Sequence, residues 1–211
     1  MIVGYIRKYL QFDTDGISPK EVATLKQTYE LLNYKYKTQF LDYKETRNLN
    51  FIYLAMQANL TGMLMVQKQF RRCFLIFTKS QSRASKMNWN DRQGSDSSYQ
   101  VRAYAILRKD YGKVFIRRKS LIDKIINIFV VASINFKMDK AFTNKFYVVA
   151  EGKGCADDAI DQHFRDLVKK FSQKDFYINI INRTLMIEYS NGLDAQKTAM
   201  MAELACAMST L

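Results

Sequence analysis

The stretch that decides the fold runs from Tyr99 to Arg118, YQVRAYAILRKDYGKVFIRR. Apolar and polar side chains alternate on both sides of residues 109–112, which have the composition of a turn. The pattern predicts two antiparallel strands, residues 99–108 and 113–118, joined to each other as a central β-hairpin. Because side chains alternate across a sheet, one face is apolar and should join the core. That face carries Val101, Ala103, Ala105, Leu107, Val114 and Ile116.

The opposite face of this predicted hairpin interleaves cations with aromatic rings. Guanidinium groups follow phosphates and rings stack on bases when proteins bind single-stranded nucleic acid. Arg71 and Arg72 precede the hairpin and extend the positive charge. We therefore expect a surface that binds an anion or a partner, made of Arg102, Tyr104, Arg108, Lys113, Phe115, Arg117 and Lys119 together with Arg71 and Arg72.

The charge of the chain is concentrated around the same stretch. The 211 residues include 33 lysines and arginines against 20 acidic residues, a net charge of +13. Residues 68–119 hold fourteen of the basic residues and only three acidic ones. A local excess of this kind produces a positive field that attracts phosphates or anionic headgroups.

Three interpretations of the basic hairpin face stay open. The favoured one is a non-enzymatic interaction protein whose partner is an acidic protein or an anionic membrane surface. The alternative is a protein that binds single-stranded nucleic acid, which would make its affinity strongly salt-dependent. The third is a structural face, since like charges along a strand edge also prevent aggregation.

The region before the hairpin is expected to be mainly helical. Ser18-Pro19-Lys20-Glu21 is a helix start, because serine caps the first turn and proline suits its first position. A second helix is expected over about residues 49–60, ending near Gly62, and residues 63–78 fit a strand better than a helix. The uncharged run Asn48–Gln67 is long enough to cross a bilayer, but its polar side chains favour a core helix over a membrane-associated one.

The region after the hairpin has a clearer pattern. A strand is expected over residues 146–150, a helix over about 156–171, and a hairpin over 176–181 and 184–189. A terminal helix rich in alanine and methionine completes a β-α-β-β-α module. Burial of that helix within the chain is favoured, and self-association through it, giving a homo-oligomer, is the alternative.

These patterns place the protein in the α+β class, with N-terminal helices, the central antiparallel hairpin and the C-terminal module. Two regions are expected: residues 1–140, which hold the helices and the basic hairpin, and residues 141–211, which hold the β-α-β-β-α module. One continuous domain across both is the alternative.

A search for catalytic and metal-binding patterns favours a protein without enzymatic activity. The single histidine, His163, lies on an amphipathic helix where solvent exposure explains it, and the nearby Asp157, Asp158 and Asp161 suit the start of that helix. The sequence shows no nucleotide-binding loop, and neither a cofactor nor a metal is expected. Three widely spaced cysteines fit buried thiols in a reducing cytoplasm, so we expect a cytoplasmic protein, peripheral to the membrane if it binds headgroups.

Overall fold

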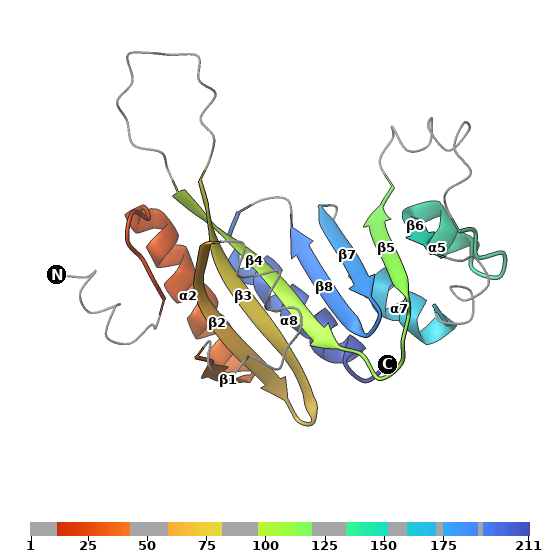
Figure 1. Cartoon of the computed structure of the whole chain (residues 1–211), viewed down its shortest axis with the longest axis horizontal. Helices are drawn as coiled ribbons and strands as arrows, with labels where there is room; N and C mark the ends of the chain where they lie inside the picture. Colours follow the sequence, from red (N-terminus) through yellow and green to blue (C-terminus); the bar gives the residue numbers. More distant parts are fainter. Residues whose placement is uncertain are drawn as a thin grey trace, which may run out of the picture.

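The computed structural model describes residues 12–42, 59–81, 97–119, 134–151, 160–171, 175–189 and 192–211. These residues form an eight-stranded antiparallel sheet and four helices, so the α+β class is confirmed (Figure 1). The strands are β1 Lys37–Phe40, β2 Asn59–Lys68, β3 Arg71–Gln81, β4 Ser97–Ile106, β5 Lys113–Arg118, β6 Phe146–Ala150, β7 Phe176–Ile181 and β8 Thr184–Tyr189. The helices are α2 Pro19–Lys35, α5 Lys140–Lys145, α7 Gln162–Lys170 and α8 Ala195–Met208.

The predicted central hairpin is wrong in its pairing, although both of its strands exist. The sheet order is β1-β2-β3-β4-β8-β7-β5-β6, so β8 and β7 lie between β4 and β5. The connecting segment binds the turn of the β7–β8 hairpin instead of closing on itself. The Leu107 N–H donates to the Arg183 carbonyl at 2.7 Å, and the Tyr111 N–H donates to the Asn182 carbonyl at 3.0 Å. The alternation of apolar and polar side chains shows where a strand lies and which of its faces is buried. It does not show which other strand pairs with it, and this explains the error.

The faces of β4 and β5 are as predicted. All six side chains expected in the core are at most 7% exposed. They belong to the main hydrophobic core, which lies between the sheet and the helices. The apolar half of the alternation in residues 99–118 was therefore sufficient to identify which side of each strand is buried.

The four described helices lie on one side of the sheet. Helix α8 contacts β2, β3, β4 and β8, and in Figure 1 it runs behind the strands. Its small residues are buried there, including Ala199, Ala202 and Ala205. Helix α2 packs beside α8, and α7 contacts its other flank. We call the opposite side of the sheet, which none of the described helices covers, the open face.

The start of α2 is confirmed and the expected helix after it is partly wrong. The Ser18 side chain accepts a hydrogen bond from the Glu21 N–H at 3.3 Å, as a helix cap should. Of the expected helix over residues 49–60, positions 49–58 lie outside the described residues, and Asn59 and Leu60 are in strand β2. The run Asn48–Gln67 is therefore not one helix.

Strand β2 has an apolar pattern that resembles a helix because both of its faces carry buried apolar side chains. Leu64 and Val66 belong to the main core, whereas Met63 is buried on the open face with Phe74 and Ile76 of β3. The expectation of strand over residues 63–78 is correct in type, but the stretch forms two strands, β2 and β3, which are joined by a turn at residues 69–70 and pair with each other. Among the described helices, none is long and apolar enough to cross a membrane.

The C-terminal β-α-β-β-α order is confirmed. Strands β6, β7 and β8 have the predicted bounds, and helix α7 begins later than expected, with Asp161 as its cap. Residues 152–159, which include Asp157 and Asp158, lie outside the described part of the chain. The sheet takes β1 to β5 from the first predicted region and β6 to β8 from the second.

Candidate functional site: the open face of the sheet

The open face over β4, β8, β7, β5 and β6 is organised in rows that cross the strands. One row consists of Arg102, Glu188, Tyr177, Arg117 and Tyr147, each directly opposite the next in the strand register. Directly opposed residues lie on the same face with their Cβ atoms about 5 Å apart. The five side chains are half-buried, neither sealed in the core nor fully in solvent.

The row brings an arginine into contact with a tyrosine ring. The guanidinium carbon of Arg117 lies 4.9 Å from the centre of the Tyr147 ring, within the range of a cation–π interaction. Beside them, the rings of Phe115 and Tyr177 are stacked, with centres 6.1 Å apart and an angle of 22° between their planes. Three aromatic rings and one arginine on three adjacent strands therefore form a continuous surface, which we call the aromatic patch.

Two cations of the predicted site are paired with carboxylates on this face. The Arg102 Nε lies 2.5 Å from the Glu188 Oε2, and the Lys113 Nζ lies 2.9 Å from the Glu151 Oε2. Glu188 is directly opposite Arg102 on the neighbouring strand, and Glu151 follows the end of β6, where its N–H donates to the Lys113 carbonyl. The strand register therefore brings each cation next to its carboxylate. The positive charge of the two cations is partly offset by these neighbouring carboxylates, more so for the less exposed Arg102 than for Lys113.

A shallow depression lies at the edge of the aromatic patch. It has a volume of about 270 Å³ and is bordered by Lys113, Phe115, Val149, Glu151 and Asn179. Its walls combine one cation, one carboxylate and one amide with apolar surface, so it can accept the side chain of a bound partner.

The remaining predicted site residues are separated by the structure. Tyr104 is 2% exposed in the smaller cluster around Met63, so its ring is not accessible for stacking. Arg72 lies at the far end of the open face on β3, whereas Arg71, one residue earlier, lies on the helix side. The nine residues therefore do not lie on one charged surface.

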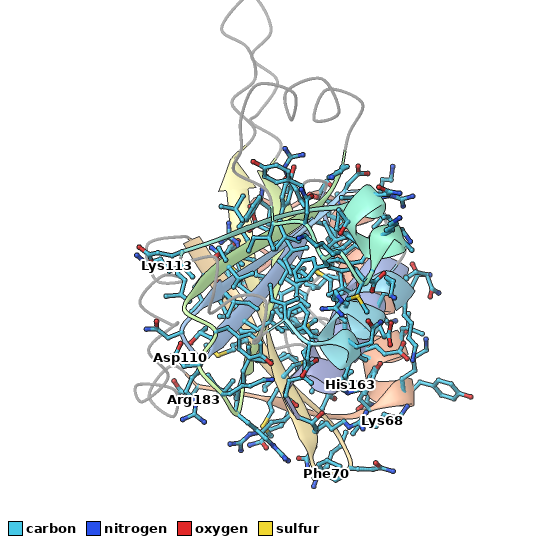
Figure 2. All side chains as sticks on the ribbon, turned by 90° about the vertical axis from the view of Figure 1, so that its right-hand side faces the viewer. Lys68, Phe70, Asp110, Lys113, His163 and Arg183 are labelled. Carbon is cyan, nitrogen blue, oxygen red and sulfur yellow. The ribbon has the colours of Figure 1, made fainter. Side chains whose placement is uncertain are left out.

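The last two predicted residues lie beyond the ends of strands. Arg108 is exposed in the β4–β5 connection, and Lys119 follows β5 directly. Figure 2 shows the two sides, with Lys113 on the open side and His163 on the helix side.

Sequence reasoning missed Tyr147 and Tyr177. Both lie in correctly predicted strands, and alternation with the buried Phe146, Val148 and Ile178 would have turned them outward. They become neighbours of Phe115 and Arg117 only through the order of the strands in the sheet. What the sequence did not show was therefore which strands pair with each other, and not which residues the strands contain.

A buried ionic cluster lies on the helix side and joins α5 to α7. The Asp139 Oδ2 is 3.3 Å from the Arg165 Nε and 3.0 Å from the Lys169 Nζ, and Asp139 Oδ1 accepts the Phe142 N–H. Burial alone would raise the pKa of Asp139, but hydrogen bonds from Lys169, the Phe142 N–H and Gln162 lower it to about 2. The cluster supplies the buried carboxylate with hydrogen bonds and counter-charges. It therefore has the features of an ion-pair network that stabilises the contact between α5 and α7.

Two thiols meet in the core although they are far apart in the sequence. Cys73 of β3 and Cys206 of α8 are both buried and free. The hydrogen bond between them, together with burial, raises the pKa of Cys73, and the same bond lowers the pKa of Cys206. Within the described residues, no group of three or more histidine, cysteine, aspartate or glutamate side chains could hold a metal ion.

Comparisons with known proteins add little. No protein-family model and no curated protein matches the sequence. One solved structure, the crystal structure of the mycobacterial trehalose monomycolate transport factor A, TtfA, aligns with 89% of this chain and 97% of its own, with 7% sequence identity and a TM-score of 0.41. A similarity at this level carries no functional argument.

Proposed function

We propose that this chain is a non-enzymatic, cytoplasmic interaction protein that binds an acidic segment of a protein partner through the aromatic patch on the open face. The observation that supports this is the contact of Arg117 with Tyr147 beside the stacked rings of Phe115 and Tyr177. Arginine and aromatic residues contribute most of the binding energy in protein interfaces.

Three features favour a protein partner. Two exposed isoleucines lie on the same face in the cross-strand row next to Phe115, Ile181 at 41% and Ile106 at 40%, and a partner would bury them. The net charge of +13 attracts acidic surfaces and speeds their association. The pairing of Arg102 and Lys113 with carboxylates interrupts the run of cations that a nucleic-acid backbone would follow.

Single-stranded nucleic acid is the second candidate. The stacked pair Phe115 and Tyr177 supports it, because rings on a sheet can stack on bases, each worth about 1–3 kcal/mol. An anionic membrane surface requires charge without stacking, and polybasic attraction to it depends on anionic headgroups.

The three partner classes are separated by binding measurements with three probes. These are a fluorescent peptide of alternating glutamate and tyrosine, oligothymidine, and vesicles with and without phosphatidylserine. We expect salt-sensitive binding of the peptide, weakened at least about tenfold, or about 1.4 kcal/mol, by the double variant Arg117→Ser with Tyr147→Ser. The variant Lys20→Ser removes an exposed charge from α2 and is the matched control.

Each result has a clear meaning. Binding of oligothymidine without the peptide would replace the favoured function by the second candidate. Binding only to vesicles with phosphatidylserine would assign the surface to membranes. If the double variant binds every probe as the unmodified protein does, the aromatic patch is not the binding surface.

A further inference from the structure

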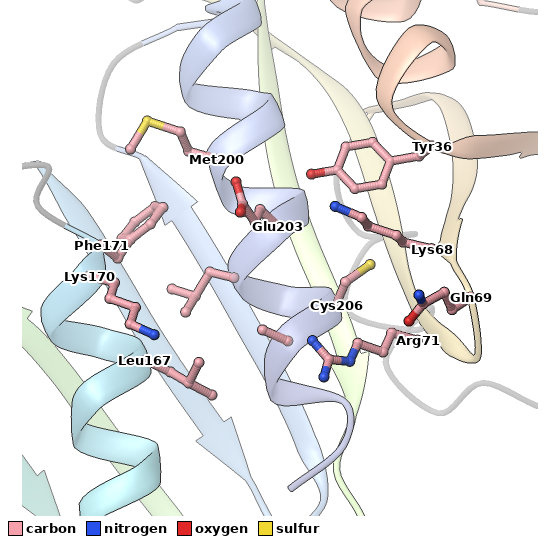
Figure 3. Close-up of a pocket in the computed structure, with 12 residues that line it drawn as sticks. Tyr36, Lys68, Gln69, Arg71, Leu167, Lys170, Phe171, Met200, Glu203 and Cys206 are labelled. Atoms are coloured by element: carbon pink, nitrogen blue, oxygen red, sulfur yellow. The ribbon is translucent and has the colours of Figure 1, made fainter.

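A pocket of about 360 Å³ lies on the helix side, away from the aromatic patch. Its base is the outer surface of α8, and it is flanked by α7 on one side and by the end of α2 and the β2–β3 turn on the other (Figure 3). This volume is within the range of small-molecule sites, about 300–1,000 Å³. The pocket is therefore large enough for a small organic ligand.

One end of the pocket carries two cations held side by side by the strand register. Lys68 and Arg71 are directly opposite each other where β2 turns into β3, and both line the pocket. Like charges at directly opposed positions destabilise a sheet. Neither side chain has a salt bridge to a carboxylate among the described residues; the Lys68 Nζ lies 5.9 Å from the Tyr36 ring centre and the Arg71 guanidinium carbon lies 5.7 Å from that of Phe70. A bound anion would relieve this repulsion.

The turn that joins the two cations has a defined backbone conformation. Gln69 adopts a φ of 58°, and its carbonyl accepts a hydrogen bond from the Gln67 side chain at 2.7 Å. The strand pairing and the turn therefore set the backbone positions of Lys68 and Arg71, whereas their exposed side chains are ordered only when a ligand binds.

The charge of the pocket is positive overall. Lys170 of α7 adds a third cation, and the one carboxylate in the lining is Glu203. Figure 3 shows Glu203 on α8 between Lys170 on one side and Lys68 with Arg71 on the other. The same field acts on the Cys206 thiol: the hydrogen bond to Cys73 is the largest cause that lowers its pKa and burial opposes it, while the charges of Arg71 and Lys68 lower the pKa further.

The rest of the lining is apolar. It consists of side chains from α7 and α8, namely Leu167, Phe171, Met200, Leu204 and Ala207. An anion as polar as free phosphate would gain nothing from these contacts, whereas a hydrocarbon chain or ring would bury its surface against them.

We propose that this pocket binds a small amphiphilic anion, with its carboxylate or phosphate group between Lys68 and Arg71 and its apolar body along α7 and α8. Arginine can bind either headgroup through two parallel hydrogen bonds. The site lies on the side of the sheet opposite the aromatic patch, so it stands or fails independently of the proposed partner-binding function.

Calorimetric titration with decanoate and with decyl phosphate tests the proposal, with decanol and inorganic phosphate as probes that lack the head and the tail. We expect saturable binding of at least one amphiphile, weakened at least about tenfold by Arg71→Gln and by Lys68→Gln. Arg72→Gln is the matched control, because Arg72 is the next residue on the same strand but points to the open face. The two amphiphiles identify the preferred headgroup.

Two further variants give results of opposite sign. Glu203→Gln removes the one negative charge and should tighten binding several-fold, and Ala207→Trp should abolish it by filling the pocket. The fold of each variant is checked by circular dichroism. The proposal is overturned if neither amphiphile binds the unmodified protein, or if decanol and inorganic phosphate bind as well as the amphiphiles. Unchanged affinity in Arg71→Gln and Lys68→Gln would also overturn it.

Discussion

Asp139, at the start of α5, is buried against Arg165 of α7, with 3.3 Å between the aspartate Oδ2 and the arginine Nε. Replacing Asp139 by asparagine would leave the buried guanidinium without its counter-charge. We expect Asp139→Asn to lower the free energy of unfolding by about 3 kcal/mol, measured by urea denaturation. Asp175→Asn, at an exposed aspartate, is the control and should change stability by less than about 0.5 kcal/mol. Equal losses in both variants would contradict the structural role of the cluster.

The same carboxylate predicts a sensitivity to acid. The pKa of Asp139 is lowered from 3.8 to about 2 in the folded protein, so folding favours its charged form. The contribution of Asp139 to the free energy of unfolding is present above about pH 4. It is lost as the pH falls towards about 2, a change of about 2 kcal/mol. The stability difference between the unmodified protein and Asp139→Asn should therefore shrink by that amount between about pH 6 and about pH 2. A difference that is independent of pH would show that Asp139 is not charged in the fold.

Gly62 is required by the ring of Phe12. A Cβ atom at position 62 would lie 2.2 Å from the Phe12 Cδ1, and that ring is held edge-on between Phe40 and Phe77. We expect Gly62→Ala to cost about 1–3 kcal/mol through overpacking, measured as a shift in the urea midpoint. In a Phe12→Ala background the same change should cost almost nothing, which a double-mutant cycle would detect. Gly192→Ala is the control, because its Cβ would meet only the Tyr99 carbonyl at 3.6 Å.

The reactivity of the Cys206 thiol should depend on the neighbouring Cys73 thiol and on the charge of Arg71. The hydrogen bond from Cys73 lowers its pKa, and the charge of Arg71 lowers it further. We expect Cys73→Ala and Arg71→Gln each to move the pH midpoint of Cys206 alkylation upward, followed by mass spectrometry in a Cys155→Ser background. Arg72→Gln should leave the midpoint in place. An unchanged midpoint in Cys73→Ala would show that no hydrogen bond from Cys73 lowers the pKa of Cys206.

Local signals in the sequence were enough for most elements. The β7–β8 hairpin was predicted with its bounds from the strand pattern on either side of residues 182–183, and Asn182 tolerates the positive φ of 55° that the turn requires. The start of α2 followed from the proline and serine at its cap. These features depend on neighbours within a few residues, which a single sequence displays directly.

Features that depend on distant segments were not predictable. Strand β4 carries no residue that specifies β8 as its neighbour, so the shortest connection suggested β5. The site had the same limit: Phe115 and Arg117 were identified, but Tyr147 and Tyr177 join them only through the sheet order. The helix over residues 49–60 was predicted in part wrongly because β2 is apolar on both faces, which removes the alternation of a strand.

The insertion of β7 and β8 between β4 and β5 also determines when the strands can pair during translation. Strands β4 and β5 leave the ribosome well before residues 176–189, which become the neighbours of both. Until then each has an unsatisfied backbone edge, and α8 is not yet made to cover β2 and β3. The middle of this sheet is thus its last part to be synthesised, so the nascent chain exposes aggregation-prone strand edges, the type of surface that chaperones protect.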